Sequence, residues 1–113
     1  MYKIVGIYNR DKERTPKIVG RYPLRIGRTV SNETILFARV GSPLILQYVT
    51  DEHGNDYSGH YLPCSRLYRK SQIDAFTVEF ETKNTIYVLK KMEMWRRWQY
   101  EKIILYYGTH MCW

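Results

Sequence analysis

The stretch FTVEFETKNTIYVLKK, residues 76–91, determines how we expect this chain to fold. Its first part alternates apolar and polar side chains, which is the pattern of a strand with one buried face. A polar turn follows, in which Asn84 is the residue best able to adopt a left-handed conformation. The next part, residues 85–89, is apolar on both faces, as is typical of a central strand. The stretch therefore predicts a β-hairpin against which earlier strands are laid.

The first half of the chain contains further segments with strand character. Pro23 interrupts one of them, so a new strand or a bend begins after it. Gly27 lies inside the next and indicates a bulge or a close approach of backbone, as at a barrel corner. The segments that we expect to be extended are residues 2–8, 17–22, 24–30 and 44–50.

The middle of the chain predicts a second hairpin. The loop DEHGND, residues 51–56, is dense in turn-forming residues, so we expect residues 57–62 to pair with residues 44–50. Residues 34–40 form a short apolar segment after a turn signal. Residues 63–74 are irregular and basic, with room for one helical turn.

The last segment, residues 92–113, is ambiguous. Opposite charges four residues apart, at Glu93, Arg97 and Glu101, favour a helix through about Tyr100. The run IILYY that follows is rich in β-branched and aromatic residues, so an extended and a helical continuation both stay open. We predict one domain, with residues 1–91 as a β-rich core. The fold class is mainly β: a small antiparallel barrel or curled sheet, SH3-like or OB-like, with a C-terminal helix.

The composition indicates a basic binding protein. Among 113 residues, 18 are Lys or Arg and 11 are Asp or Glu, which gives a net charge of +7. The positive charge is concentrated toward both ends of the chain, and eleven tyrosines raise the aromatic fraction to 15%. This balance favours a polyanionic or acidic partner. An ordinary solvated basic surface explains it equally well.

The cysteines and the apolar runs indicate a cytoplasmic protein. Cys64 and Cys112 have no disulfide-framework spacing, which favours reduced thiols. The first residues lack the pattern of a signal peptide, and the longest apolar run, residues 103–107, is too short to cross a bilayer. We therefore expect no membrane association.

Metal binding and catalysis are the less favoured interpretations. His60 and Cys64, with His110 and Cys112, are zinc-ligating types, but their spacing is not that of a finger or ribbon. The acidic loop at residues 51–56 has groups suited to acid–base chemistry or hard cations, and the same groups are common in exposed turns. The sequence has no phosphate-binding glycine loop and no nucleophile-elbow motif. We predict a protein without enzymatic activity, cofactor or metal.

Basic residues interleaved with aromatic ones form the candidate binding site. Guanidinium groups bind phosphate or carboxylate in a bidentate manner, and aromatic rings such as Tyr22 and Tyr68 offer stacking faces. In the last segment, one tryptophan is expected to pack on the sheet beside Tyr87 and Leu89 while the other binds a partner. The predicted binding residues are Arg21, Arg25, Arg28, Arg66, Arg69, Lys70, Trp95, Arg96, Arg97, Trp98 and Tyr100.

Three segments carry a resemblance: RIGRTV at residues 25–30, GSPLILQYVTDEHGNDYSGHY at 41–61 and VEFETKNTIYVLKK at 78–91. They resemble short, uncharacterised proteins carried by phages and conjugative elements of Gram-positive bacteria. Some small proteins from such settings inhibit host immunity, including anti-CRISPR proteins. The resemblance covers about residues 18–91, implies a bacterial host cytoplasm as the setting and assigns no site residues.

Together these observations predict an inhibitor without enzymatic activity. Its expected partner is a large nucleoprotein or nuclease of host defence, whose nucleic-acid-binding surface it occupies. Two alternatives stay open. One is a regulator of a mobile element that binds DNA or RNA directly, and the other is a scavenger of nucleotide second messengers that holds a small anion in a basic, aromatic pocket.

Overall fold

The hairpin expected from residues 76–91 is present in the computed structural model, which describes residues 1–92. Strands β5 (Thr77–Thr82) and β6 (Thr85–Lys91) pair antiparallel through a two-residue turn. The expectation of a left-handed Asn84 is wrong, because Arg14 is the one described residue other than glycine with a positive φ. The turn is closed instead by the Thr82 hydroxyl, which donates to the Thr85 carbonyl at 3.2 Å.

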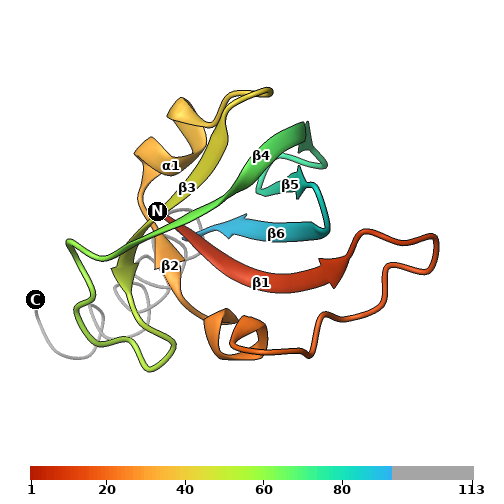
Figure 1. Cartoon of the computed structure of the whole chain (residues 1–113). Coiled ribbons are helices and arrows are strands. Elements are labelled where there is room, and N and C mark those ends of the chain that lie inside the picture. Colours follow the sequence, from red (N-terminus) through yellow and green to blue (C-terminus); the bar gives the residue numbers. More distant parts are fainter. Residues whose placement is uncertain (93–113) are drawn as a thin grey trace, which may run out of the picture.

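The described residues form a closed antiparallel barrel of six strands, in which each strand lies beside its neighbours in sequence (Figure 1). Strand β6 lies between β5 and β1, so its interpretation as a central strand is confirmed. The first strand thus closes the barrel on the last. The remaining strands are β1 (Tyr2–Asn9), β2 (Thr29–Val30), β3 (Pro43–Thr50) and β4 (Tyr61–Gln72).

The segment before β2 differs from the expectation of two extended stretches. Residues 17–22 form no strand, and η1 (Tyr22–Arg25) is a 3₁₀ helix that begins beside Pro23. Proline favours this position because its fixed φ suits a first helical turn. Gly27 adopts a φ of +97° and its N–H donates to the Ile4 carbonyl at 2.8 Å, so the expected special backbone is a turn that leads into β2.

The expectation of an irregular stretch at residues 63–74 is wrong, because β4 continues to Gln72. The β3–β4 ladder shifts register between Pro43 and Ile45, and the β4–β5 ladder shifts between Leu67 and Arg69. Each shift interrupts the alternation of inward and outward side chains, which removes the period-two pattern from the sequence. The predicted second hairpin is confirmed: Leu46 and Gln47 pair with Leu62 and Tyr61, and the N–H groups of Tyr48 and Tyr57 donate to the carbonyls of His60 and Val49.

The short apolar segment after the first turn forms helix α1 (Asn32–Phe37). The side chain of Ser31 caps the helix by accepting from the Thr34 N–H. The Thr34 hydroxyl accepts from the Gln47 N–H at 3.0 Å. Helix α1 thus provides a hydrogen-bond partner for a backbone N–H of β3 where β2 has ended. The predicted C-terminal helix and the rest of residues 93–113 lie outside the described residues.

The barrel interior is apolar and closely surrounded by strands. Five strands each contribute a side chain that is 0% exposed: Ile4, Leu46, Leu67, Phe80 and Leu89. In the described part of the chain, no helix has the length and apolarity that crossing a membrane requires.

Candidate binding surface

The predicted residue Arg28 has a structural role. Its Nε donates to the Glu52 carboxylate at 2.9 Å, and its guanidinium lies 5.1 Å from the Tyr48 ring centroid and 5.2 Å from that of Tyr57. Burial lowers the pKa of Arg28, but the interactions with Glu52 and Tyr48 together outweigh it and the pKa is raised. These contacts tie the turn before β2 to the loop after β3.

Two other predicted residues are also engaged within the protein. Arg25 lies 4.7 Å from the ring centroid of Tyr22, on which Lys17 also packs at 4.4 Å. Lys70 donates from Nζ to the Ile35 carbonyl at 2.6 Å and so joins β4 to the end of α1. Of the predicted residues in the described part of the chain, Arg21, Arg66 and Arg69 have exposed side chains without an ion pair there.

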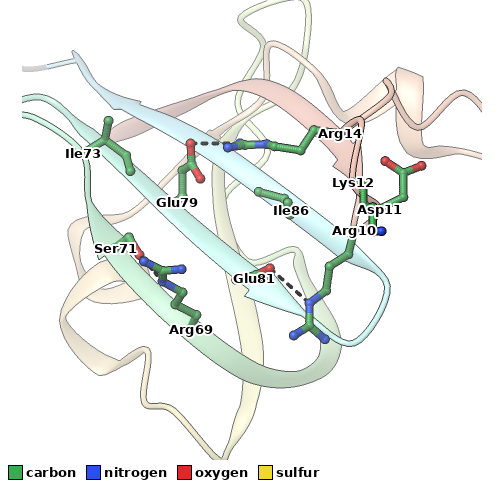
Figure 2. Close-up of a pocket in the computed structure, with 10 residues that line it drawn as sticks. All are labelled: Arg10, Asp11, Lys12, Arg14, Arg69, Ser71, Ile73, Glu79, Glu81 and Ile86. Carbon is green, nitrogen blue, oxygen red and sulfur yellow. Dashed lines mark hydrogen bonds and ion pairs between the residues drawn. The ribbon is translucent and has the colours of Figure 1, made fainter.

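A pocket of about 410 Å³ lies on the outer wall of the barrel, where β4, β5 and β6 are covered at one side by the loop after β1 (Figure 2). Its lining mixes both signs of charge with two isoleucines. Ile86 is 6% exposed although it points away from the interior, because the loop shields it. The lining residues are Arg10, Asp11, Lys12, Arg14, Arg69, Ser71, Ile73, Glu79, Glu81 and Ile86.

Two arginines of the loop fasten it to the wall. Arg14 donates to Glu79 at 3.0 Å and Arg10 donates to Glu81 at 3.1 Å, both across the width of β6, as Figure 2 shows. The guanidinium of Arg10 also lies 4.8 Å from the ring centroid of Tyr68 on β4. Both carboxylates are thereby neutralised, so they do not present free negative charge to a ligand.

The remaining cations of the pocket are available. Arg69 donates to the hydroxyl of Ser71 at 3.0 Å and makes no ion pair with a described residue. Lys12 is exposed at the end of the loop and likewise has no acidic partner in the described part. Tyr68, 45% exposed, lies next to Arg69 in the chain and adds an aromatic face.

Two further lysines lie on the same wall, toward its other end. Lys3 of β1 and Lys90 of β6 are both exposed and stand directly opposite each other in the ladder. Like charges in this position repel and destabilise a sheet. The positive charge of Lys90 is offset in part by the carboxylate of Asp74. Hydrogen bonds from Phe76 and Thr77, together with the charge of Lys90, lower the pKa of Asp74. We name Lys3, Lys90, Lys12, Arg69 and Tyr68 the outer basic surface.

Sequence reasoning identified only Arg69 and Tyr68 of this surface. The alternating charges of residues 9–15 and the glutamates on the polar face of β5 were a signal for the loop contacts. Lys3 and Lys90 lie opposite each other because β1 pairs with β6, and these strands lie at the two ends of the described chain. Trp95, Arg96, Arg97, Trp98 and Tyr100 lie outside the described residues.

The acidic loop after β3 is a set of turn contacts. The Asp51 carboxylate accepts from the backbone N–H groups of His53 and Asn55, each at 2.9 Å. Desolvation raises the pKa of Asp51, but these hydrogen bonds outweigh it and hold the pKa below its usual value. Hydrogen bonds from Ser58 lower the pKa of Asp56 as well. Both carboxylates are therefore ionised at neutral pH and accept hydrogen bonds from their own loop.

The His60 and Cys64 pair considered for zinc shows separate contacts. His60 stacks on Tyr57 at a centroid distance of 4.2 Å, whereas the Cys64 thiol donates to the Tyr87 hydroxyl at 3.7 Å. Burial raises the pKa of the Cys64 thiol. Among the residues that the structure describes, no three potential metal ligands come together. His110 and Cys112 are not among these residues.

Comparisons of the chain with protein-family models, curated proteins and solved structures found no match.

Proposed function

We propose that this protein is a binding module without enzymatic activity, which inhibits a host-defence nucleoprotein by contacting the phosphates of its nucleic acid. One observation supports the proposal most: Lys3 and Lys90 lie opposite each other on the same barrel wall as Lys12 and Arg69, the available cations of the pocket. An anion placed between two like charges relieves their repulsion, and phosphate is the anion that Lys and Arg commonly bind.

The sign of the charge supports contact with nucleic acid over contact with the protein surface that binds it. Such a surface is itself rich in Lys and Arg, so it would repel a chain of net charge +7. The nucleic acid attracts that charge and releases counterions on binding. The proposal therefore combines the expected inhibitor with the direct nucleic-acid contact that the sequence left open as an alternative.

The pocket itself gives less support to a nucleotide scavenger. Glu79 and Glu81 form part of its lining, and a phosphate seated there would compete with them for Arg14 and Arg10. Breaking two ion pairs to form others offers little net gain in free energy. A strand of nucleic acid that passes over the wall reaches the available cations without this exchange. Barrels of the OB-like type, one of the subtypes we expected, bind oligonucleotides across an outer face in this way.

The test measures binding to fluorescein-labelled single-stranded DNA and RNA of about 20 nucleotides, followed by anisotropy between about 50 and 200 mM salt. Replacing Lys3→Gln and Lys90→Gln together should weaken binding and reduce the magnitude of the salt slope by about 1.4, which corresponds to two phosphate contacts on a single strand. A circular dichroism spectrum checks that the variant keeps the fold.

The matched control is the double variant Arg21→Gln with Arg66→Gln, which removes the same charge from exposed positions outside the outer basic surface. We expect a smaller loss of affinity from it. Equal losses in the two variants would contradict the proposed surface, and absence of binding in the wild type would contradict the function. A captured host nucleoprotein should be released when nuclease digests its nucleic acid.

A further inference from the structure

Helix α1 exposes large apolar side chains that the barrel does not use. Thr34 and Ile35 turn inward and are buried, whereas Leu36 and Phe37 are 73% and 75% exposed. Val40, just beyond the helix, is 58% exposed. Adjacent apolar side chains this accessible are typical of a surface that another protein covers. Figure 1 places α1 at the periphery, beside β3.

The charges at the two ends of this patch are of opposite sign. Glu33 lies in the first turn of α1 and Arg39 just after its last residue, and both are exposed. Within the described part of the chain, neither forms an ion pair. Glu33 lies three and four residues before Leu36 and Phe37, so all three share one face of the helix.

This arrangement is complementary to itself. Leu36 stands midway in sequence between Glu33 and Arg39. When two copies of α1 lie antiparallel about a two-fold axis near Leu36, the first turn of each helix, which holds Glu33, lies beside the last turn of the other, after which Arg39 follows. The leucines then meet at the axis and the Phe37 rings flank it. A two-fold axis requires this reciprocity, in which the same patch serves both copies.

We propose that the protein forms a two-fold symmetric dimer through Leu36 and Phe37 of α1, with the charges of Glu33 and Arg39 paired between the copies. The inference does not depend on the proposed function, because α1 contributes no residue to the outer basic surface. The patch is short, so the dimer dissociates on dilution rather than being permanent.

Sedimentation velocity tests the proposal on the full chain at concentrations on the order of 1 to 200 µM. The mass of the wild type should rise toward 27.4 kDa, twice the 13.7 kDa of one chain. Leu36→Glu and Phe37→Glu, singly, should keep it at 13.7 kDa throughout. The matched control is Ile18→Glu, which places the same charge at another apolar side chain, 77% exposed, and should leave the dimer intact.

Charge reversal tests the symmetry separately. Glu33→Arg alone and Arg39→Glu alone should each weaken the dimer at least several-fold, because each places like charges opposite one another. The double variant E33R/R39E should restore the affinity, since it exchanges the two signs. A monomeric wild type at the highest concentration, or a dimer that persists in both glutamate variants, would overturn the proposal. So would a double variant as weak as the singles, which would indicate another orientation or another occupant of α1.

Discussion

Single residues of this protein divide into cations that stabilise the fold and cations that remain available. Arg28 shows the first kind most clearly, because its side chain is 17% exposed and has a carboxylate and two aromatic rings as neighbours. Lys3 shows the second, since its neighbour across the ladder has the same charge. The distinction matters for mutagenesis: replacing Arg28 tests folding, whereas replacing Lys3 tests binding.

The Arg28–Glu52 pair makes stability depend on pH. The hydrogen bond from Arg28 is the main cause that lowers the pKa of Glu52 below its ordinary value of 4.5. A carboxyl with a lowered pKa contributes stability above about pH 4.5, and that contribution is lost as the pH falls through its folded-state value. We predict that the Tm of the wild type falls more between about pH 6 and pH 3 than that of Glu52→Gln. Parallel Tm curves from scanning calorimetry would contradict this role.

At the scale of elements, the loop after β1 is fastened to the wall by ion pairs and shields Ile86 there. Asn9 and Lys17 anchor its ends by backbone hydrogen bonds, to Thr15 and Ile7 respectively. Between them, Arg10 and Arg14 reach over β6 to β5. Helix α1 has a comparable role at β3, where it supplies a hydroxyl to a backbone N–H beyond the end of β2. In both places a side chain extends the contacts that the strands alone provide.

We predict a small but measurable coupling between Arg14 and Glu79. Their side chains are 46% and 21% exposed, so solvent screens the pair and a coupling of about 0.2–1 kcal/mol is expected. A double-mutant cycle with Arg14→Ala and Glu79→Ala, measured by urea unfolding, gives this value. The control cycle pairs Arg14→Ala with Glu33→Ala on α1 and should give a coupling near zero. A zero value for Arg14 with Glu79 would show that the contact does not stabilise the fold.

At the scale of the whole molecule, the barrel wall is uneven. Strand β2 has two residues, while β1, β5 and β6 form long ladders, with one register shift between Ile4 and Gly6, and contain much of the buried core. The wall is therefore weakest between β1 and β3. Local opening starts where few backbone hydrogen bonds and few apolar contacts must be broken.

Hydrogen exchange should reveal this difference. We predict that amides of β6, which is paired on both sides, exchange most slowly, and that Thr29 and Val30 of β2 exchange faster by at least tenfold. Mass spectrometry of peptic peptides at neutral pH measures both rates. Equal protection of β2 and β6 would mean that the barrel opens only as a unit.

The sequence predicted those elements that have an alternating pattern or a run of β-branched and aromatic residues. Residues 2–8 and 44–50 each lie in one strand, and residues 76–91 contain two. The part of β4 beyond Leu62 was missed because two register shifts break its alternation, and η1 was missed because its apolar residues are largely exposed. The opposed lysines, like the contact of Arg14 with Glu79, depend on which strands meet, and no local pattern contains that information.

The pairing of β1 with β6 also constrains how the chain is made. Its shortest link, from Asn9 to Thr85, spans 76 positions, so β1 leaves the ribosome long before its main partner exists. Until then the side of β1 that pairs with β6 is an open edge, and the charge on Lys3 discourages other chains from pairing with it. Contacts this distant in sequence also slow folding. A nascent chain that stalls before residue 85 would expose β1 without this partner, and a chaperone could then bind the exposed strand.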